Sequence, residues 1–156
     1  MNRALIEEYA RGGPVVTQAI QGLTRAEFNA FPVPGTWSIA QIVLHLMDSD
    51  LIASDRMKRV IAEDNPTIIG YNEALFAQRL FYEQLDPFLA ADLFARNRQL
   101  MAEILRRLPD AAYERAGTHN EAGRVTLGGL VETYVKHLEH HLKFLRQKRQ
   151  LLGKAL

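Results

Sequence analysis

The chain has 156 residues, of which 47% are apolar and 24% charged, and its formal net charge is +1. This length suits one compact domain, so we expect a single domain over residues 1–156. The near-neutral charge gives no reason to expect nucleic acid or a membrane surface as a partner. No apolar run approaches the ~20 residues of a membrane span, and acidic residues near the start argue against a secretory signal, so we expect a cytoplasmic protein. The lack of cysteine excludes disulfides, thiolate ligands and a cysteine nucleophile.

The first predicted element is a helix over residues 3–22. A Gly-Gly-Pro sequence ending at Pro14 interrupts it. Because proline inside a helix costs about 3 kcal/mol, we expect either a kink or a helix that restarts at this proline. Residues 24–27 match a capping box and predict one short helical turn. Two prolines within residues 31–35 predict a loop.

The second predicted helix covers residues 38–62. Ser38 and Gln41 form another capping box, and apolar residues then repeat at spacings of three and four. His45 falls at the edge of this apolar stripe, where a helical bundle can hold a ligand outside its dry centre. Asp48 lies one turn further on and could support that histidine or accept a proton, although a solvated aspartate is the simpler interpretation.

In the middle of the chain, the sequence pattern predicts one more long helix between irregular connections. Residues 63–72 form the longest irregular stretch, and residues 76–85 are expected to be partly helical. Asp followed by Pro is a helix-start signal, so a third long helix is predicted over residues 86–108. A short turn is expected within residues 109–117 and a loop at residues 119–123. No alternating apolar pattern predicts a strand anywhere.

The fourth predicted helix begins after Thr126 and carries three of the five histidines. Residues four apart lie on one face of a helix, so His137 and His141 can converge on one metal ion. By angular position these two lie roughly 90° and 50° from the centre of the apolar arc, whereas His140 lies about 150° away, toward solvent. Four long helices with connections of this length predict an all-α four-helix bundle.

Four ordered segments resemble the DinB/YfiT-like family of small helical bundles, also called DinB-like metalloenzymes. They are Pro34-Gly-Thr-Trp-Ser-Ile39 leading to His45, Thr67-Ile-Ile-Gly-Tyr71 followed by Glu83-Gln-Leu-Asp-Pro87, Leu105-Arg-Arg-Leu-Pro109, and Thr126-Leu127 followed by His137-x-x-x-His141. The resemblance spans nearly the whole chain. It implies an up-down-down-up topology, with short extra helical turns, and one divalent metal ion bound by His45, His137 and His141.

Three neutral imidazoles with an open position are typical of a catalytic rather than a structural zinc-type site. Imidazole also suits other metals, so zinc, nickel and iron all stay open. Di-iron carboxylate bundles need Glu three residues before a histidine, and no histidine here has one. The alternative is that these histidines are ordinary helix-surface residues. His119, in a predicted loop, and His140 are expected to be solvated.

The function expected from the resemblance is a metal-dependent thiol transferase or small-molecule hydrolase. Its partners would be a small-molecule substrate, with a low-molecular-weight thiol as one candidate, and a second copy of the chain. Wide apolar stripes on the first and third long helices favour such a homodimer. The competing hypothesis is a non-enzymatic helical module in which a metal, if bound, only braces the bundle. Tyr134, one turn before His137, could reach the site or belong to the core, and no catalytic residue is assigned.

Overall fold

The structure is a computed structural model that describes residues 3–156. Its four long helices confirm the predicted bundle, and their bounds are close to those expected from the sequence. They are α1 (Arg3–Ala19), α3 (Ile39–Ala62), α5 (Pro87–Arg107) and α6 (Leu127–Leu151). Each of the last three begins at the predicted capping residue: Ser38, Asp86 and Thr126 accept hydrogen bonds from backbone N–H groups of the first turn.

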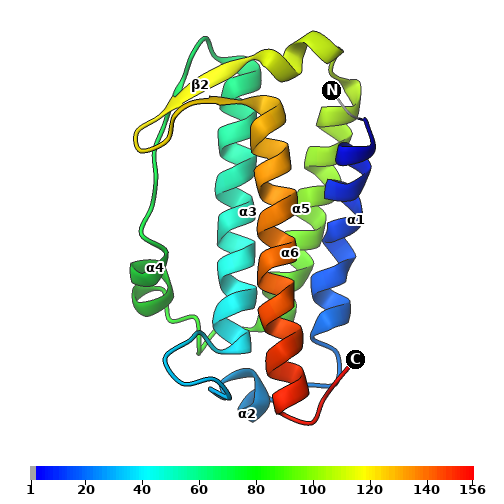
Figure 1. The fold of residues 1–156 in the computed structure, drawn as a ribbon, viewed down its shortest axis with the longest axis vertical. Helices are drawn as coiled ribbons and strands as arrows, with labels where there is room; N and C mark the ends of the chain where they lie inside the picture. The colour runs from blue at the N-terminus through cyan, green and yellow to red at the C-terminus, as the bar shows by residue number, and fades with distance from the viewer. Residues whose placement is uncertain (1–2) are drawn as a thin grey trace.

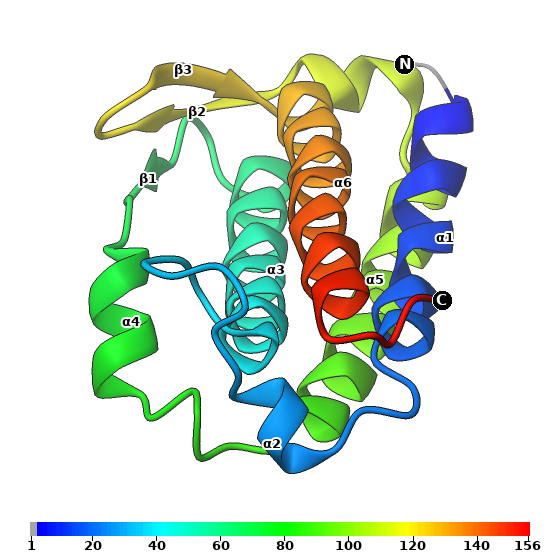
Figure 2. The same ribbon diagram turned by 60° about the horizontal axis from the view of Figure 1, so that its bottom comes forward.

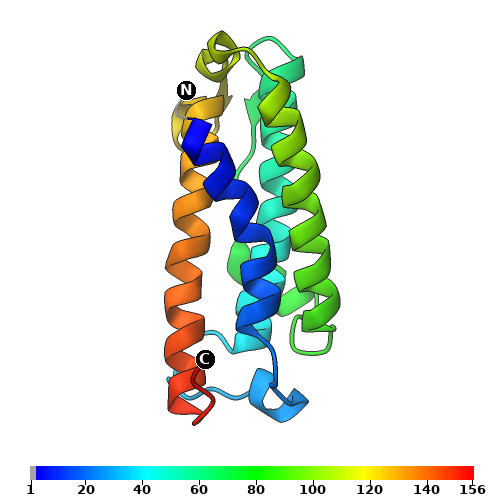
Figure 3. The ribbon, with the colours of Figure 1, turned by 90° about the vertical axis from the view of Figure 1, so that its right-hand side faces the viewer.

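The helices form a square in which α1 and α3 each pack against both α5 and α6 (Figures 1 and 2). α1 and α6 run in one direction and α3 and α5 in the other, which is the up-down-down-up order (Figure 1). Figure 3 shows α1 lying across α5 and α6. Because α3 and α5 are parallel neighbours, a long connection must return the chain along the whole bundle. α3 and α6 lie side by side and antiparallel, so their facing side chains can meet.

α1 continues through Pro14, so of the two expected outcomes, a kink or a restart of the helix, the restart is wrong. The two glycines before it are buried and face α5. A Cβ atom at Gly12 would lie 2.6 Å from a guanidinium nitrogen of Arg98, and one at Gly13 would lie 3.3 Å from the backbone oxygen of Ala95. The glycines therefore permit a close approach of α1 to α5, and packing maintains a helix that local propensity disfavours.

The prediction that the chain has no strands is wrong. β1 (Thr67–Ile68) pairs in parallel with β2 (Ala116–His119), which pairs antiparallel with β3 (Gly123–Thr126). These strands have two to four residues, too few to produce a visible alternation of apolar and polar residues. They join the connection after α3 to the connection before α6 at one end of the bundle (Figure 1).

Three short helical segments complete the connections. α2 (Arg25–Phe28) is the predicted turn and has the expected capping box. α4 (Glu73–Arg79) lies somewhat earlier than the helical segment expected at residues 76–85. A 3₁₀ helix (Asp110–Glu114) is the turn predicted after α5.

Two basic residues near the end of α6 are buried rather than solvated. Lys148 is buried and donates to the Thr36 hydroxyl at 2.5 Å, which fastens the loop before α3 to α6. Arg149 is also buried, and its guanidinium donates to the backbone oxygens of Ala19 and Gln21 at 3.1 and 2.9 Å. It therefore satisfies carbonyl groups at the end of α1.

The third long helix leaves part of its apolar surface uncovered, whereas no large apolar residue of α1 is strongly exposed among the described residues. The exposed apolar side chains of α5 are Phe88, Leu89, Leu93 and Leu100. None of the described helices is both long and apolar enough to cross a membrane.

Candidate metal centre

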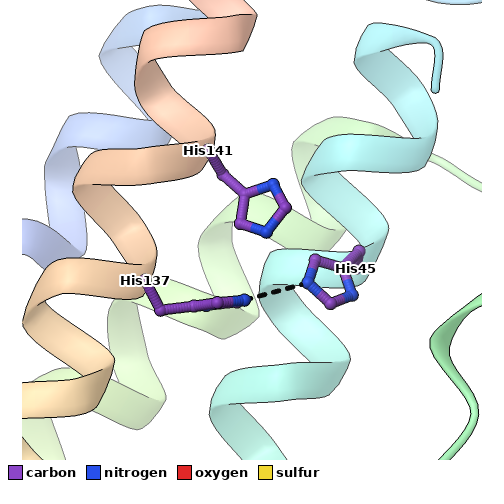
Figure 4. A group of neighbouring side chains, drawn as sticks. All are labelled: His45, His137 and His141. Atoms are coloured by element: carbon purple, nitrogen blue, oxygen red, sulfur yellow. Dashed lines mark hydrogen bonds between the residues drawn. The ribbon is translucent and has the colours of Figure 1, made fainter. Parts of the chain in front are cut away.

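Three histidines meet between α3 and α6 (Figure 4). His45 comes from α3, and His137 and His141 come from successive turns of α6. One ring nitrogen from each lies within 4.8 Å of the others. The Nε2 atoms of His45 and His137 are 3.1 Å apart. The structure therefore brings together all three residues that the sequence selected as ligands.

The spacing of these nitrogens fits one small ion. Nitrogen ligands about 2.0–2.1 Å from a tetrahedral zinc ion lie roughly 3.4 Å from one another. The His45–His137 pair already has nearly this separation, and the third nitrogen needs only a modest shift inward. No other group of His, Asp and Glu side chains within residues 3–156 gathers three ligand atoms in this way.

The site also holds its imidazoles in the neutral form that binds metals. Burial lowers the pKa of His45 to about 3, with further lowering from His141 and His137. Burial likewise lowers the pKa of His137 to about 3 and that of His141 to about 4. At neutral pH each ring therefore offers a lone pair, and protonation of any ring would place a charge beside the other two.

Packing, rather than a hydrogen-bonded acceptor, orients His45. This side chain is fully buried, and its Nδ1 atom has no hydrogen-bond partner among the described residues. Metal-binding histidines usually donate this second N–H to an acceptor. Here the Trp37 ring lies 4.8 Å from the His45 ring and is stacked on His141 at 6.3 Å with an interplanar angle of 11°. Trp37 thus forms one wall of the histidine cluster.

Asp48 is not in contact with the histidines. Its carboxylate accepts a hydrogen bond of 2.5 Å from the hydroxyl of Tyr82, which ties the connection before α5 to α3. No contact therefore supports the role beside His45 that was expected for Asp48.

Tyr134 belongs to both the core and the edge of the site. It is buried, and its ring centroid lies 6.0 Å from that of His137. Its hydroxyl accepts a hydrogen bond of 2.9 Å from Arg56. Sequence reasoning missed Arg56 entirely. The sequence signal for Arg56 was its position eleven residues after His45, because this spacing places the two side chains within about 20° of each other around the helix.

The remaining two histidines lie outside the cluster. His140 is exposed, with its ring packed against Phe144 at 4.9 Å. His119 is half-buried, and its Nδ1 accepts hydrogen bonds from the backbone N–H groups of Glu121 and Ala122. It closes the turn between β2 and β3, so the expectation that it is simply solvated needs correction.

The fold and the histidine cluster define a class of protein: a four-helix bundle with three converging imidazoles between two antiparallel helices. The model of the DinB superfamily matches residues 8–145. The chain belongs to this superfamily, which confirms the resemblance seen in the sequence.

Two curated bacterial relatives illustrate this relationship. A protein of Oceanobacillus iheyensis named "Putative metal-dependent hydrolase" is 32% identical over 108 residues, which cover 69% of this chain but only 62% of that protein. "Putative metal-dependent hydrolase YfiT" of Bacillus subtilis is 26% identical over 137 residues, covering 87% of this chain and 77% of that protein.

Two solved structures share the fold. The structure of YfiT from Bacillus subtilis, which has a four-helix bundle topology described as unusual, matches with a TM-score of 0.90 and 24% identity, covering 96% of this chain and 86% of that one. The mycothiol-dependent maleylpyruvate isomerase matches with a TM-score of 0.71 and 14% identity, covering 91% of this chain and 59% of that one. At these identities the likeness establishes the architecture alone.

Proposed function

We propose that this protein is a metal-dependent enzyme in which His45, His137 and His141 bind one divalent metal ion. The single observation that carries the proposal is the convergence of three neutral imidazoles from two helices, one of them buried and two half-buried. Relatives that bear the name "Putative metal-dependent hydrolase" support it. When bound, a metal ion with an open position can activate water or hold a thiol as thiolate. Zinc, nickel and iron all suit three imidazoles.

The reaction class we propose is thiol transfer to an electrophile or hydrolysis of a small molecule. The names of the relatives favour hydrolysis, whereas the shared fold of a mycothiol-dependent isomerase supports a thiol co-substrate. The chain's own contribution would be to keep three imidazoles unprotonated and to shield one side of the cluster with Trp37. We expect neither nucleic acid nor membrane to be a partner.

Metal analysis tests the ligand set. Untagged protein, purified without a metal-affinity column and then exposed to zinc, nickel or iron, should contain about one ion per chain. His45→Ala and His137→Ala should contain little. His140→Ala is the matched control, because it removes an exposed histidine from the same helix, and it should bind metal like the wild type. Equal metal content in all four proteins, or none in the wild type, would overturn the proposal.

Activity assays separate the two reaction classes. Metal-loaded protein is incubated with a model electrophile and a panel of low-molecular-weight thiols, and separately with ester and amide substrates without thiol. Thiol-dependent consumption of the electrophile would favour transfer, and thiol-independent cleavage would favour hydrolysis. A non-enzymatic module predicts a large loss of melting temperature on chelation and no turnover with any substrate.

We also propose that two chains associate through α5. Its exposed leucines form a stripe on one side of the bundle: Leu89, Leu93 and Leu100 are 68%, 42% and 58% exposed. Burial of such a stripe against its own copy is the usual arrangement in two-fold dimers. Light scattering at tens of micromolar should give the mass of a dimer for the wild type and of a monomer for Leu89→Glu. A wild-type monomer would contradict this part of the proposal.

A further inference from the structure

A row of polar side chains leads away from the histidine cluster between α3 and α6. On α3, Ser49 and Arg56 follow His45 by four and eleven residues, so all three lie within about 40° of one another around the helix. On α6, Tyr134 precedes His137 by almost one turn. Ser49 and Tyr134 are both buried. The groups nearest the cluster on this side are therefore hydroxyls, followed by one guanidinium.

Arg56 is a half-buried cation without an acidic partner among the described residues. Its Nη1 donates to the Tyr134 hydroxyl at 2.9 Å and its Nη2 to the backbone oxygen of Ile69 at 2.8 Å. Its Nε atom is buried without a partner. By contrast, Arg59 on the same helix pairs with Asp55 at 2.8 Å. A guanidinium carries five N–H donors, so Arg56 retains the capacity to bind an anion.

Two tyrosine hydroxyls accompany this guanidinium. Because Arg56 donates to the Tyr134 oxygen, the proton of that hydroxyl is free to be donated elsewhere. The Tyr71 hydroxyl is buried and lies near Ser49, Tyr134 and Arg56. Burial raises the pKa of Tyr71 to about 12. The cluster therefore offers donors and the positive charge of Arg56, which is the chemistry that recognises a carboxylate. The exposed Glu73 is the acid whose charge adds to the raised pKa of both tyrosines.

A pocket between α3 and β1 gives access to Arg56. Its volume is about 280 Å³, and Ile52, Ile68 and Ile69 form its apolar walls. Asp55 and Arg59 also line it, but they neutralise each other. The net charge of the lining is thus that of Arg56 alone. A carboxylate with an apolar body matches this lining, whereas a phosphate dianion would call for further cations.

We propose that Arg56, with the hydroxyls of Tyr134 and Tyr71, binds the carboxylate of a small apolar acid that serves as substrate. This inference rests on the proposed function, because it assigns a substrate class to the same site. The carboxylate would hold one end of the molecule on this side of the histidine cluster. Arg56 is thus a specificity-determining residue, and its charge, rather than its packing, provides the discrimination.

The test compares hexanoate with hexanamide, a neutral molecule of nearly the same shape. Each is titrated into ¹⁵N-labelled protein, both metal-free and zinc-loaded, and dissociation constants are taken from the Arg56 Nε–H resonance and the backbone amides near Ile69. We expect wild-type protein to bind hexanoate at least tenfold more tightly than hexanamide. A charge-assisted hydrogen bond of about 1.4 kcal/mol corresponds to this factor of ten.

The variants separate charge from packing. Arg56→Gln should bind both molecules with the same affinity, and Arg56→Lys should recover part of the preference. Lys58→Gln removes an exposed cation of the same helix that does not line the pocket, and it should keep the full preference. Equal affinities in the wild type, or a preference that persists in Arg56→Gln, would overturn the proposal. The metal-free titration remains informative if no metal binds, so failure of the metal proposal and failure of this one are distinguishable.

Discussion

Two polar clusters are buried in this bundle, and both begin on α3. Asp50 and Arg98 form an ion pair at 2.8 Å with both side chains 1% exposed. Asn97 donates to the second carboxylate oxygen of Asp50 at 2.7 Å, and the Arg98 Nη2 donates to the backbone oxygen of Tyr134 at 2.8 Å. Five residues earlier, His45 has a buried Nδ1 without a partner and an Nε2 that faces another ring nitrogen.

The difference shows how buried polar groups reveal their role. In the Asp50–Arg98 cluster each charge meets its opposite and the donors meet acceptors, so the cluster is complete without any further group. In the histidine cluster, the Nε2 atoms of His45 and His137 face each other, and the buried Nδ1 of His45 has no partner among the described residues. A structural cluster is closed by its own residues, whereas a binding cluster needs something from outside.

The ion pair should dominate the stability of the bundle. Asp50→Ala leaves the Arg98 guanidinium buried without its partner, which typically costs about 3–5 kcal/mol. Urea denaturation of metal-free protein should show a loss of this size. Asp92→Ala is the matched control, because Asp92 forms an exposed pair with Arg96 on α5, and it should change stability by less than about 1 kcal/mol. Similar losses in both variants would show that the buried ion pair contributes no more to stability than the exposed one.

The histidine cluster should instead make stability depend on pH. The pKa values of His45 and His137 in the folded protein, about 3, lie below the usual value of 6.5. The unfolded chain therefore binds more protons below pH 6.5, and stability falls as the pH drops from 6.5 toward 3. Between pH 6.5 and 4 we expect metal-free protein to lose on the order of 3 kcal/mol of unfolding free energy for each of these two imidazoles.

Denaturant titrations at several pH values measure this slope. His45→Leu should reduce it, because the most deeply buried imidazole is gone. His140→Ala should change it far less, because the exposed His140 only adds to the lowered pKa values of His137 and His141. A flat profile in the wild type, or an identical slope in His45→Leu, would mean that the imidazoles are not held neutral by burial.

The smallest effect is expected for the hydrogen bond between Tyr82 and Asp48, and its removal tests whether Asp48 stabilises the fold or contributes to the metal centre. Tyr82→Phe removes the hydrogen bond to Asp48 and should cost about 1 kcal/mol of stability. The zinc dissociation constant, measured by competition with a chromophoric chelator, should stay within about twofold of the wild type. A tenfold weaker zinc affinity would instead assign Asp48 to the metal centre.

The sequence predicted the parts of the fold that depend on local chemistry. Caps at Ser38, Asp86 and Thr126 gave the starts of three long helices almost to the residue. The spacing of His137 and His141, together with the family resemblance, identified the full histidine cluster before the structure placed its members side by side.

The parts that could not be predicted depend on contacts between distant segments. Pro14 stays inside α1 because the preceding glycines permit close packing on α5, and no local rule contains that information. β1 and β2 pair across about fifty residues. Asp50 and Arg98 each resemble an ordinary surface charge on an amphipathic helix, and only their packing together makes them buried. Arg56 was overlooked for the same reason, because its contacts come from α6 and from the chain after β1.

The separation of the histidines along the chain has a consequence for biosynthesis. His45 and His137 are 92 residues apart. A nascent chain that has emerged only through α5 carries one member of the cluster, and α6 alone carries two. The cluster therefore forms only when the last helix docks against α3, after loop closure over most of the chain. A metal ion that binds there would bind to a folded bundle in which the spacing of the three histidines is already set. The choice among the metals of the cell would therefore follow folding rather than direct it.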